Sequence, residues 1–273
     1  MQKILLIIAA VLLFLPNLFN KDINPTLSYD NKESFNPQLS YINDIQTLES
    51  YVDSIAVAKK ISPADFKYVE LLEIVIEDRF YHGFSHFTLN ENWLAAFAGK
   101  YIKEDYACKV QPEKIMQQGN AACSQQALVM MAVLRNKKIS YRSVGFPHHY
   151  AMEVLIENNW YFFDTNMEPR ITKGQRMMTS WNHQNDSLKK YYDARHYTNL
   201  NYQFGNGLTA TTGIINEVPA KNARIFQATT CILSKIIWCF PILLIFYRPR
   251  FSFKRPFISS NFQRKNPSFS LSV

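Results

Sequence analysis

Two apolar runs, one near each end of the chain, constrain its fold more than any other feature. The first covers residues 4–15 and follows the single early cation Lys3, which is the pattern of a secretory signal. The second covers residues 228–247, close to the roughly 20 residues that cross a bilayer as a helix. The residues between them, from about 21 to 225, are therefore predicted to fold as a unit that lies between two membrane segments.

Neither apolar run has only one interpretation. No small-x-small cleavage site follows the first run, so residues 1–20 are either a removed signal peptide or an uncleaved signal anchor. The second run contains Lys235, whose long side chain can reach the headgroups near the outer end of a membrane helix. We expect residues 226–247 to form a transmembrane helix, and a buried core helix is the alternative.

The formal net charge of +8 is concentrated after the second apolar run. Six Lys and Arg residues and no Asp or Glu lie in residues 248–273. Such a basic flank is typical of the cytoplasmic side of a membrane helix. We therefore predict a cytoplasmic basic tail and an extracytoplasmic domain, periplasmic or extracellular, and we expect no nucleic acid as a partner.

Hydrophobic periodicity predicts an α+β domain. Residues 21–40 are polar and contain two prolines, so they form a linker, and the folded domain is expected over residues 41–225. Helical spacing comes first and strand patterns follow, which is the order of an α+β fold with an antiparallel sheet. The predicted helices cover 42–58, 62–80, 93–101 and 123–136, and the predicted strands cover 141–146, 150–156 and 160–164.

Three residues have the chemistry and the predicted placement of a nucleophilic site. A thiol reacts as its thiolate, which a helix N-terminus and a neighbouring imidazolium favour. Cys123 follows the small residues 119–122 and begins a predicted helix. His149 begins one predicted strand and Asp164 ends the next strand of the same hairpin, so the two can lie side by side as a base and its orienting carboxylate.

The sequence around these residues resembles the transglutaminase-like, papain-type superfamily. In that family a Cys begins a helix, a His begins a segment of the kind His-Ala-Trp-x-Glu-Val, and an Asp follows a Trp by about four residues. The resemblance covers roughly residues 112–168, about a fifth of the chain. Its matching segments are GNAACSQQAL at 119–128, ISYRSVG at 139–145, HYAMEV at 149–154 and WYFFDT at 160–165. Tyr150 and Met152 depart from the family pattern, which leaves the substrate preference open.

The resemblance implies a fold, a reaction and a role for each residue. The fold is a nucleophile-bearing helix packed on an antiparallel sheet. Cys123 matches the nucleophile, His149 the base and Asp164 the group that orients it. The oxyanion needs a backbone N–H at Cys123 and a side-chain amide, for which Gln117 and Gln118 are both candidates. This chemistry requires no cofactor, and the sequence predicts no metal site.

Each of these residues also has a structural interpretation. His148 competes with His149 as the base, and Asp164 is also a residue type that ends strands in turns. In an oxidising compartment Cys123 can pair with Cys108 as a disulfide, which would block the thiol. A second pair, His82 and His86, has the spacing of neighbouring zinc ligands, but no third ligand is evident nearby.

The implied function is thiol acyl transfer on amide or peptide bonds of a protein or peptide substrate. Whether water or an amine resolves the acyl-enzyme separates a protease or amidase from a cross-linking enzyme, and no residue distinguishes them. The alternative is a catalytically silent domain that binds peptide, cell-wall material or a neighbouring membrane protein. A Cys108–Cys123 disulfide would favour that alternative.

Overall fold

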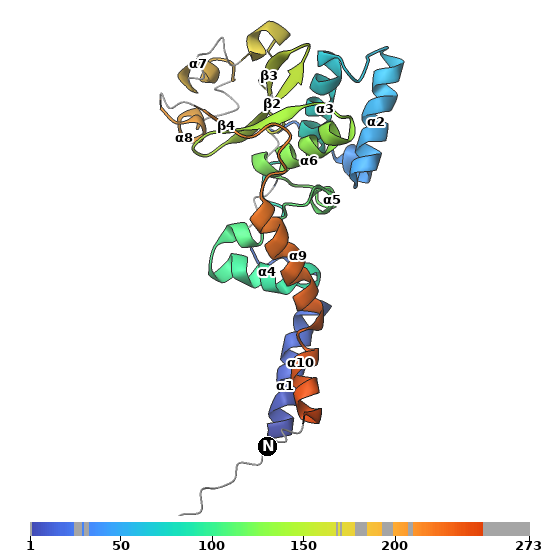
Figure 1. The fold of residues 1–273 in the computed structure, drawn as a ribbon, viewed down its shortest axis with the longest axis vertical. Helices are drawn as coiled ribbons and strands as arrows, with labels where there is room; N and C mark the ends of the chain where they lie inside the picture. Colours follow the sequence, from blue (N-terminus) through green and yellow to red (C-terminus); the bar gives the residue numbers. More distant parts are fainter. Residues whose placement is uncertain are drawn as a thin grey trace, which may run out of the picture.

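The chain folds into an α+β domain, and a pair of apolar helices extends from it (Figure 1). The structure is a computed structural model, and it describes residues 2–24, 29, 33–167, 169, 171–177, 185–192, 199–206 and 210–247. The predicted basic tail, residues 248–273, lies outside the described residues.

The elements follow the predicted order of helices first and an antiparallel sheet second. The helices are α1 (Gln2–Phe14), α2 (Ile45–Ala58), α3 (Phe66–Arg79), α4 (Leu89–Tyr101), α5 (Pro112–Ile115), α6 (Cys123–Asn136), α7 (Asn185–Lys189), α8 (Leu200–Phe204), α9 (Lys221–Ile236) and α10 (Cys239–Phe246). The strands are β1 (Tyr141–Gly145), β2 (Tyr150–Ile156), β3 (Asn159–Phe163) and β4 (Thr211–Thr212). Short 3₁₀ turns are η1 (Leu15–Leu18), η2 (Pro37–Tyr41), η3 (Glu104–Tyr106) and η4 (Lys173–Arg176).

Two predicted helices begin at other residues than expected, and local hydrogen bonds to side chains explain both differences. The helix predicted over 62–80 begins at Phe66, because Ser62 enters a turn in which its N–H donates to Asp65 Oδ2 at 3.0 Å. The helix predicted over 93–101 begins earlier, at Leu89, because Glu91 accepts the backbone N–H of Thr88 at 2.9 Å. A Thr followed by a Glu three residues later is a capping box, which fixes a helix start.

The sheet has the order β3-β2-β1-β4, and all its pairings are antiparallel. The turn between β2 and β3 contains Glu157 and Asn158 with φ values of 50° and 63°, as the tightest hairpin turns require. β4 adds a short edge to β1 through residues 211–212. That edge strand comes from the segment after residue 168, where the sequence pattern is weakest.

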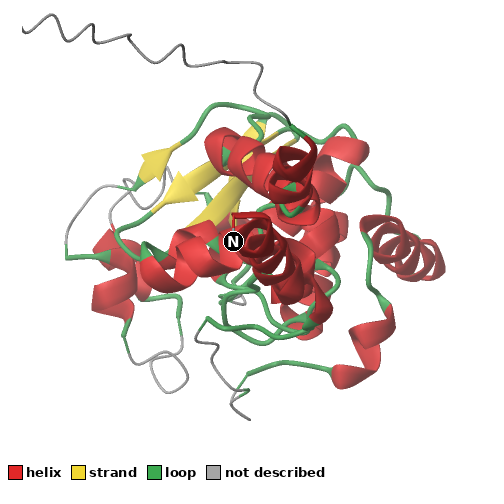
Figure 2. Ribbon diagram, turned by 90° about the horizontal axis from the view of Figure 1, so that it is seen from below, coloured by secondary structure: helices red, strands yellow, loops and turns green. Residues whose placement is uncertain are grey.

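Each face of the sheet packs against a different part of the chain. Alternate strand residues such as Met152, Val154 and Phe163 face a large core that includes α2, α3 and α6. The residues between them, Ala151 and Phe162 among others, face a smaller core built with α7 and α8. Figure 2 shows the strands with helices around them. The helix that begins with Cys123 therefore packs on the sheet, as predicted for the α+β core.

The second predicted membrane segment is two helices, not one. No single helix in the described part of the chain is both long and apolar enough to cross a membrane, although α9 and α10 together pass that test with a bend of 51° between them. α9 packs against α4 through polar contacts, for example from Asn92 Nδ2 to Thr230 Oγ1 at 2.9 Å. The prediction of one continuous transmembrane helix over residues 226–247 is therefore wrong for its first half, because α9 packs against α4 as part of the folded domain.

Candidate functional site

Cys123 is the first residue of α6, and a buried amide holds the segment in front of it. Gln125 Oε1 accepts the backbone N–H groups of Ser85 at 2.8 Å and Ala122 at 3.2 Å. Its Nε2 donates to the carbonyls of Ser85 at 2.9 Å and Lys109 at 2.8 Å. One side chain thus joins three segments of chain, and it fixes the helix start that carries the thiol.

Two backbone N–H groups lie at the helix start beside the Cys123 thiol. Within the described residues, the N–H groups of Cys123 and Ser124 have no hydrogen-bond acceptor, as is usual for the first turn of a helix. Such donors can stabilise an oxyanion at the attacked carbonyl. Gln117 is exposed and Gln118 is half-buried in the turn after α5, and neither amide makes a side-chain hydrogen bond to another described residue.

His149 lies in a turn between β1 and β2 and is enclosed by aromatic rings. Its carbonyl accepts the N–H of Phe146 at 2.9 Å, which closes the turn. The Phe146 ring stacks on the imidazole at 6.2 Å, and the Phe204 ring meets it edge-on at 5.0 Å between centroids. The side chain is 2% exposed, so its ring orientation is fixed by packing.

The neighbouring His148 is in a different environment. It is exposed, and its ring stacks on Tyr202 of α8 with a centroid distance of 4.0 Å and an interplanar angle of 3°. Of the two adjacent histidines, only His149 contacts the carboxylate of Asp164.

Asp164 follows β3, and its carboxylate contacts four hydrogen-bond donors. Oδ2 lies 2.6 Å from His149 Nε2 and accepts the hydroxyl of Tyr192 at 2.7 Å. Oδ1 accepts the backbone N–H groups of Asn166 at 3.2 Å and Met167 at 3.1 Å. A buried carboxylate with four donors is stable in its charged form. Because Asp164 occupies Nε2 of His149, Nδ1 is the ring nitrogen that remains for the thiol.

A buried ion pair holds the backbone of Asp164. Glu73 of α3 accepts the N–H of Asp164 at 2.6 Å, and Arg176 Nη1 lies 3.1 Å and 3.0 Å from the two Glu73 oxygens. Both side chains are fully buried. Arg176 also donates to the carbonyl of Phe162 at 3.2 Å. Glu73, Arg176 and Tyr192 support the site, yet nothing in the sequence analysis identified them.

The pKa of His149 depends on both Asp164 and Cys123. Burial acts to lower the pKa of His149, but the charge of Asp164, its hydrogen bond and the interaction with the Cys123 thiol outweigh it and raise that pKa to about 10. Burial acts to raise the pKa of Asp164, but the charge and hydrogen bonds of His149, with help from Tyr192, hold it below its ordinary value. At neutral pH the arrangement therefore favours a protonated His149 imidazolium beside an ionised Asp164 carboxylate.

This pairing should make stability depend on pH in one direction. Because the folded-state pKa of His149 is above its ordinary 6.5, the protonated ring stabilises the fold fully below about pH 6.5, and this contribution is lost as the pH rises towards 10. The Tm difference between the protein and a His149→Gln variant should thus shrink from pH 6.5 to pH 10. Calorimetry measures it, and a difference that stays constant over this range would contradict the pairing.

Removing the Tyr192 hydroxyl should weaken the site without unfolding the domain. The Tyr192→Phe variant keeps the ring packed on Phe204 but takes one donor from the buried Asp164 carboxylate. We expect a loss of about 1.5–3 kcal/mol in unfolding free energy, typical of a hydrogen bond to a charged group. Urea unfolding measures it, with Tyr202→Phe as the exposed control, and equal effects of the two changes would refute the role of the Tyr192 hydroxyl.

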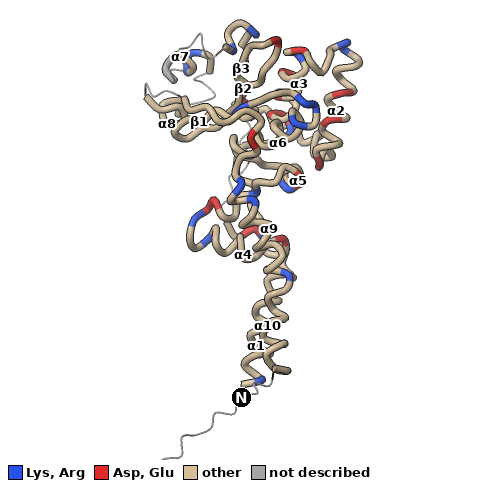
Figure 3. The backbone as a smooth tube through the Cα atoms, in the orientation of Figure 1, with Lys and Arg blue, Asp and Glu red and all other residues tan. Residues whose placement is uncertain are grey.

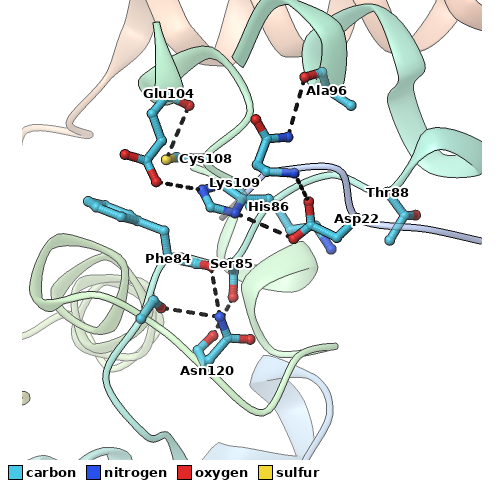
Figure 4. A network of polar contacts seen from close by, with 12 residues as sticks. Asp22, Phe84, Ser85, His86, Thr88, Ala96, Glu104, Cys108, Lys109 and Asn120 are labelled. Atoms are coloured by element: carbon cyan, nitrogen blue, oxygen red, sulfur yellow. Dashed lines mark hydrogen bonds and ion pairs between the residues drawn. The ribbon is translucent and has the colours of Figure 1, made fainter. Parts of the chain in front are cut away.

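His82 and His86 are not brought together as ligands of one metal. His86 lies between two carboxylates, with Nδ1 3.4 Å from Asp22 Oδ2 and Nε2 3.4 Å from Glu104 Oε1 (Figure 4). His82 is near the Cys123 site instead: burial and the charge of His149 lower its pKa, while a hydrogen bond with Asn166 acts to raise it. Among the described residues, no group of three or more His, Cys, Asp or Glu side chains can hold a metal ion.

Cys108 and Cys123 are both free thiols in different surroundings. Cys108 is buried beside the His86 network, where its Sγ lies 3.5 Å from the carbonyl oxygen of Glu104. Burial, and then the nearby Glu104 charge, raise the pKa of Cys108 well above its ordinary value. A buried thiol of this kind is unreactive. The disulfide considered as an alternative is not formed in this structure.

Nothing matches this chain in comparisons with protein-family models, curated proteins and solved structures. The transglutaminase-like resemblance therefore stays a prediction from four short segments.

Proposed function

We propose that the protein is a thiol acyl-transfer enzyme that acts on amide or peptide bonds, with Cys123 as nucleophile and His149 as proton carrier. The observation that supports it best is the buried contact of 2.6 Å between His149 Nε2 and Asp164 Oδ2, on a ring that also interacts with the Cys123 thiol. A base held by a carboxylate beside a nucleophile is the recurring arrangement of acyl-transfer sites.

The steps follow from the groups present. The Cys123 thiolate attacks the carbonyl carbon, a C–S bond forms, and the carbonyl electron pair moves to oxygen next to the N–H groups of Cys123 and Ser124. The C–N bond then breaks, and His149 gives its proton to the departing ammonia or amine. Water or a second amine attacks the thioester, His149 takes its proton, and the thiolate of Cys123 leaves. Asp164 holds the imidazole throughout.

The same proposal includes a place in the cell and a class of partner. The domain is membrane-attached and extracytoplasmic, with the basic tail in the cytoplasm, and its substrate is a protein or peptide at that surface. The positive charge that follows the second apolar run supports this orientation. A neighbouring membrane protein is a further candidate partner.

An activated ester tests the chemistry without knowledge of the natural substrate. Full-length protein mixed with p-nitrophenyl acetate should release a burst of about one equivalent of p-nitrophenol. Mass spectrometry should then find one acetyl group on Cys123. Faster turnover with added glycine ethyl ester would identify amine transfer. A turnover rate that does not change with the added amine would identify hydrolysis.

Cys123→Ala is the matched control, because it retains the other three thiols. It should show neither burst nor adduct. If the unmodified protein also shows no burst, the enzyme proposal fails, and a silent domain that binds peptide or cell-wall material becomes the better account.

A further inference from the structure

The paired helices α1 and α10 expose apolar side chains on all their outer surfaces. Figure 1 shows them side by side below the domain, with α4 lying across their upper end. On α1, Ile4, Leu5 and Leu12 are 59–62% exposed, and on α10, Phe240, Leu243 and Phe246 are 63–77% exposed. An apolar surface of this extent marks a site of membrane or protein contact.

α1 and the turn after it contact specific residues elsewhere in the fold. A signal sequence that is removed makes no such contacts in the mature protein. Asn17 Nδ2 donates to the carbonyl of Ser234 at 3.0 Å, and Lys235 Nζ lies 3.2 Å from Asn17 Oδ1. The rings of Phe14 and Trp238 meet edge-on at 5.4 Å. Cleavage near residue 20 would take away these contacts together with the helix that packs along α10.

The segment that follows α1 is also joined to the domain. The carbonyls of Phe19 and Lys21 accept the N–H groups of Asn90 and Leu89 at 2.9 Å each, at the start of α4. Asp22 continues into the buried contact with His86 (Figure 4). The chain is therefore fixed on both sides of the position at which a signal peptidase would have to cut.

Charges lie at the two ends of this helix pair and not between them. Figure 3 shows the pair tan over most of its length, with blue only near its ends. Lys3 is at the far end, and Arg248 and Arg250 follow α10 directly in the sequence. At the near end are Lys235 and the polar contacts of Asn17.

Length and charge together select one arrangement in a membrane. The 13 residues of α1 rise about 20 Å, and η1 adds roughly 8 Å, against a hydrocarbon thickness of about 30 Å. A pair embedded only halfway would leave Lys3 and the cations that follow α10 near the bilayer centre, where a charged side chain is costly. Full crossing with Lys3 and Lys235 extended to the two headgroup layers avoids that cost.

We propose that α1 is retained in the mature protein and pairs with α10 as a two-helix anchor that crosses a lipid bilayer. Both chain ends then emerge on the side opposite to the domain. α4 and the last turns of α9 rest at the near surface, so they set the height of the Cys123 site above the lipid. This inference rests on the membrane attachment in the proposed function and adds its architecture.

Vesicle flotation of the purified full-length protein tests the anchor. The protein is reconstituted from detergent into vesicles of phosphatidylcholine and phosphatidylglycerol, which are washed with alkaline carbonate and floated on a density gradient. We expect at least nine-tenths of the protein to float. The intact mass of protein purified from cell membranes should include α1. A mass that lacks about the first 20 residues, or release by carbonate, would overturn the proposal.

Charged substitutions on the outer surface of the helix pair test whether flotation depends on contact between these two helices and lipid. The double variant Leu12→Asp and Leu243→Asp should lose most of its flotation, while Val57→Asp, at a 78% exposed site on α2, should float like the unmodified protein. Iodoacetamide labelling of Cys123 should be unchanged in both variants, which shows that the domain is folded. A double variant that still floats would refute the anchor, and that result would leave the acyl-transfer proposal untouched.

Discussion

Replacing Arg176 with leucine should destabilise the domain by about 3–5 kcal/mol, the usual cost of leaving one member of a buried ion pair without its partner. The change leaves the fully buried Glu73 carboxylate facing the backbone of Asp164 without its counter-ion. It also removes a hydrogen bond to the Phe162 carbonyl. Urea unfolding of the full-length protein, followed by circular dichroism, measures the loss.

Two further variants show whether charge is the cause. Lys103→Met breaks an ion pair with Asp105 that is exposed on both sides, and such pairs contribute about 0–1 kcal/mol. In the double variant Glu73→Gln and Arg176→Met, the glutamine oxygen can still accept the Asp164 N–H, so part of the stability should return. If Arg176→Leu costs no more than Lys103→Met, the buried pair does not support Asp164 as described.

Replacing His149 with alanine should slow acetylation of Cys123 by p-nitrophenyl acetate by about 100- to 10,000-fold, the range associated with a positioned proton carrier. The variant removes the group that accepts the thiol proton. It leaves in place the start of α6 and the hydrogen bonds of Gln125 to Ser85 and Ala122. The burst of p-nitrophenol at pH 7 measures the rate.

The neighbouring residue supplies a matched control for this substitution. His148→Ala removes an imidazole from the same turn, but that ring is exposed and stacks on Tyr202. We expect its acetylation rate to stay within about threefold of the unmodified protein. Equal loss in both variants would mean that the turn, and not the His149 imidazole, is what the reaction requires.

The sequence predicted the parts of the site that lie next to regular elements. Cys123 begins α6 and His149 precedes β2, with Asp164 one residue after β3, because strand alternation and helical spacing are local signals. The order of helices and strands gave the α+β class for the same reason. The β2–β3 turn was recognisable from the Glu157-Asn158-Asn159 sequence.

The supporting residues were beyond sequence reasoning for a physical reason. Glu73 lies inside a predicted helix, where an acidic residue is ordinarily exposed, and only the three-dimensional fold shows that it meets Arg176 from 103 residues away. Tyr192 belongs to a segment without periodicity, and it reaches Asp164 through the smaller core on the second face of the sheet. Contacts of this kind leave no spacing pattern in a single sequence.

Polar residues inside the second apolar run indicated that its first half packs against protein, but an average of hydropathy over the whole run does not show them. Gln227, Thr230 and Ser234 recur at spacings of three and four residues, which places them on one face of a helix. In the structure this face of α9 meets α4 and the segment around Cys108 through hydrogen bonds. A polar face inside an apolar stretch is a sign of packing against protein.

The pH dependence of iodoacetamide labelling at Cys123 tests the central claim most directly. If Cys123 is held as a thiolate in an ion pair with the His149 imidazolium, the labelling rate at pH 6 should be within about tenfold of the rate at pH 9. In the His149→Ala variant this plateau should disappear. An ordinary thiol with a pKa near 8.5 would label about 200-fold more slowly at pH 6 than at pH 9. That steep profile in the unmodified protein would contradict an activated Cys123.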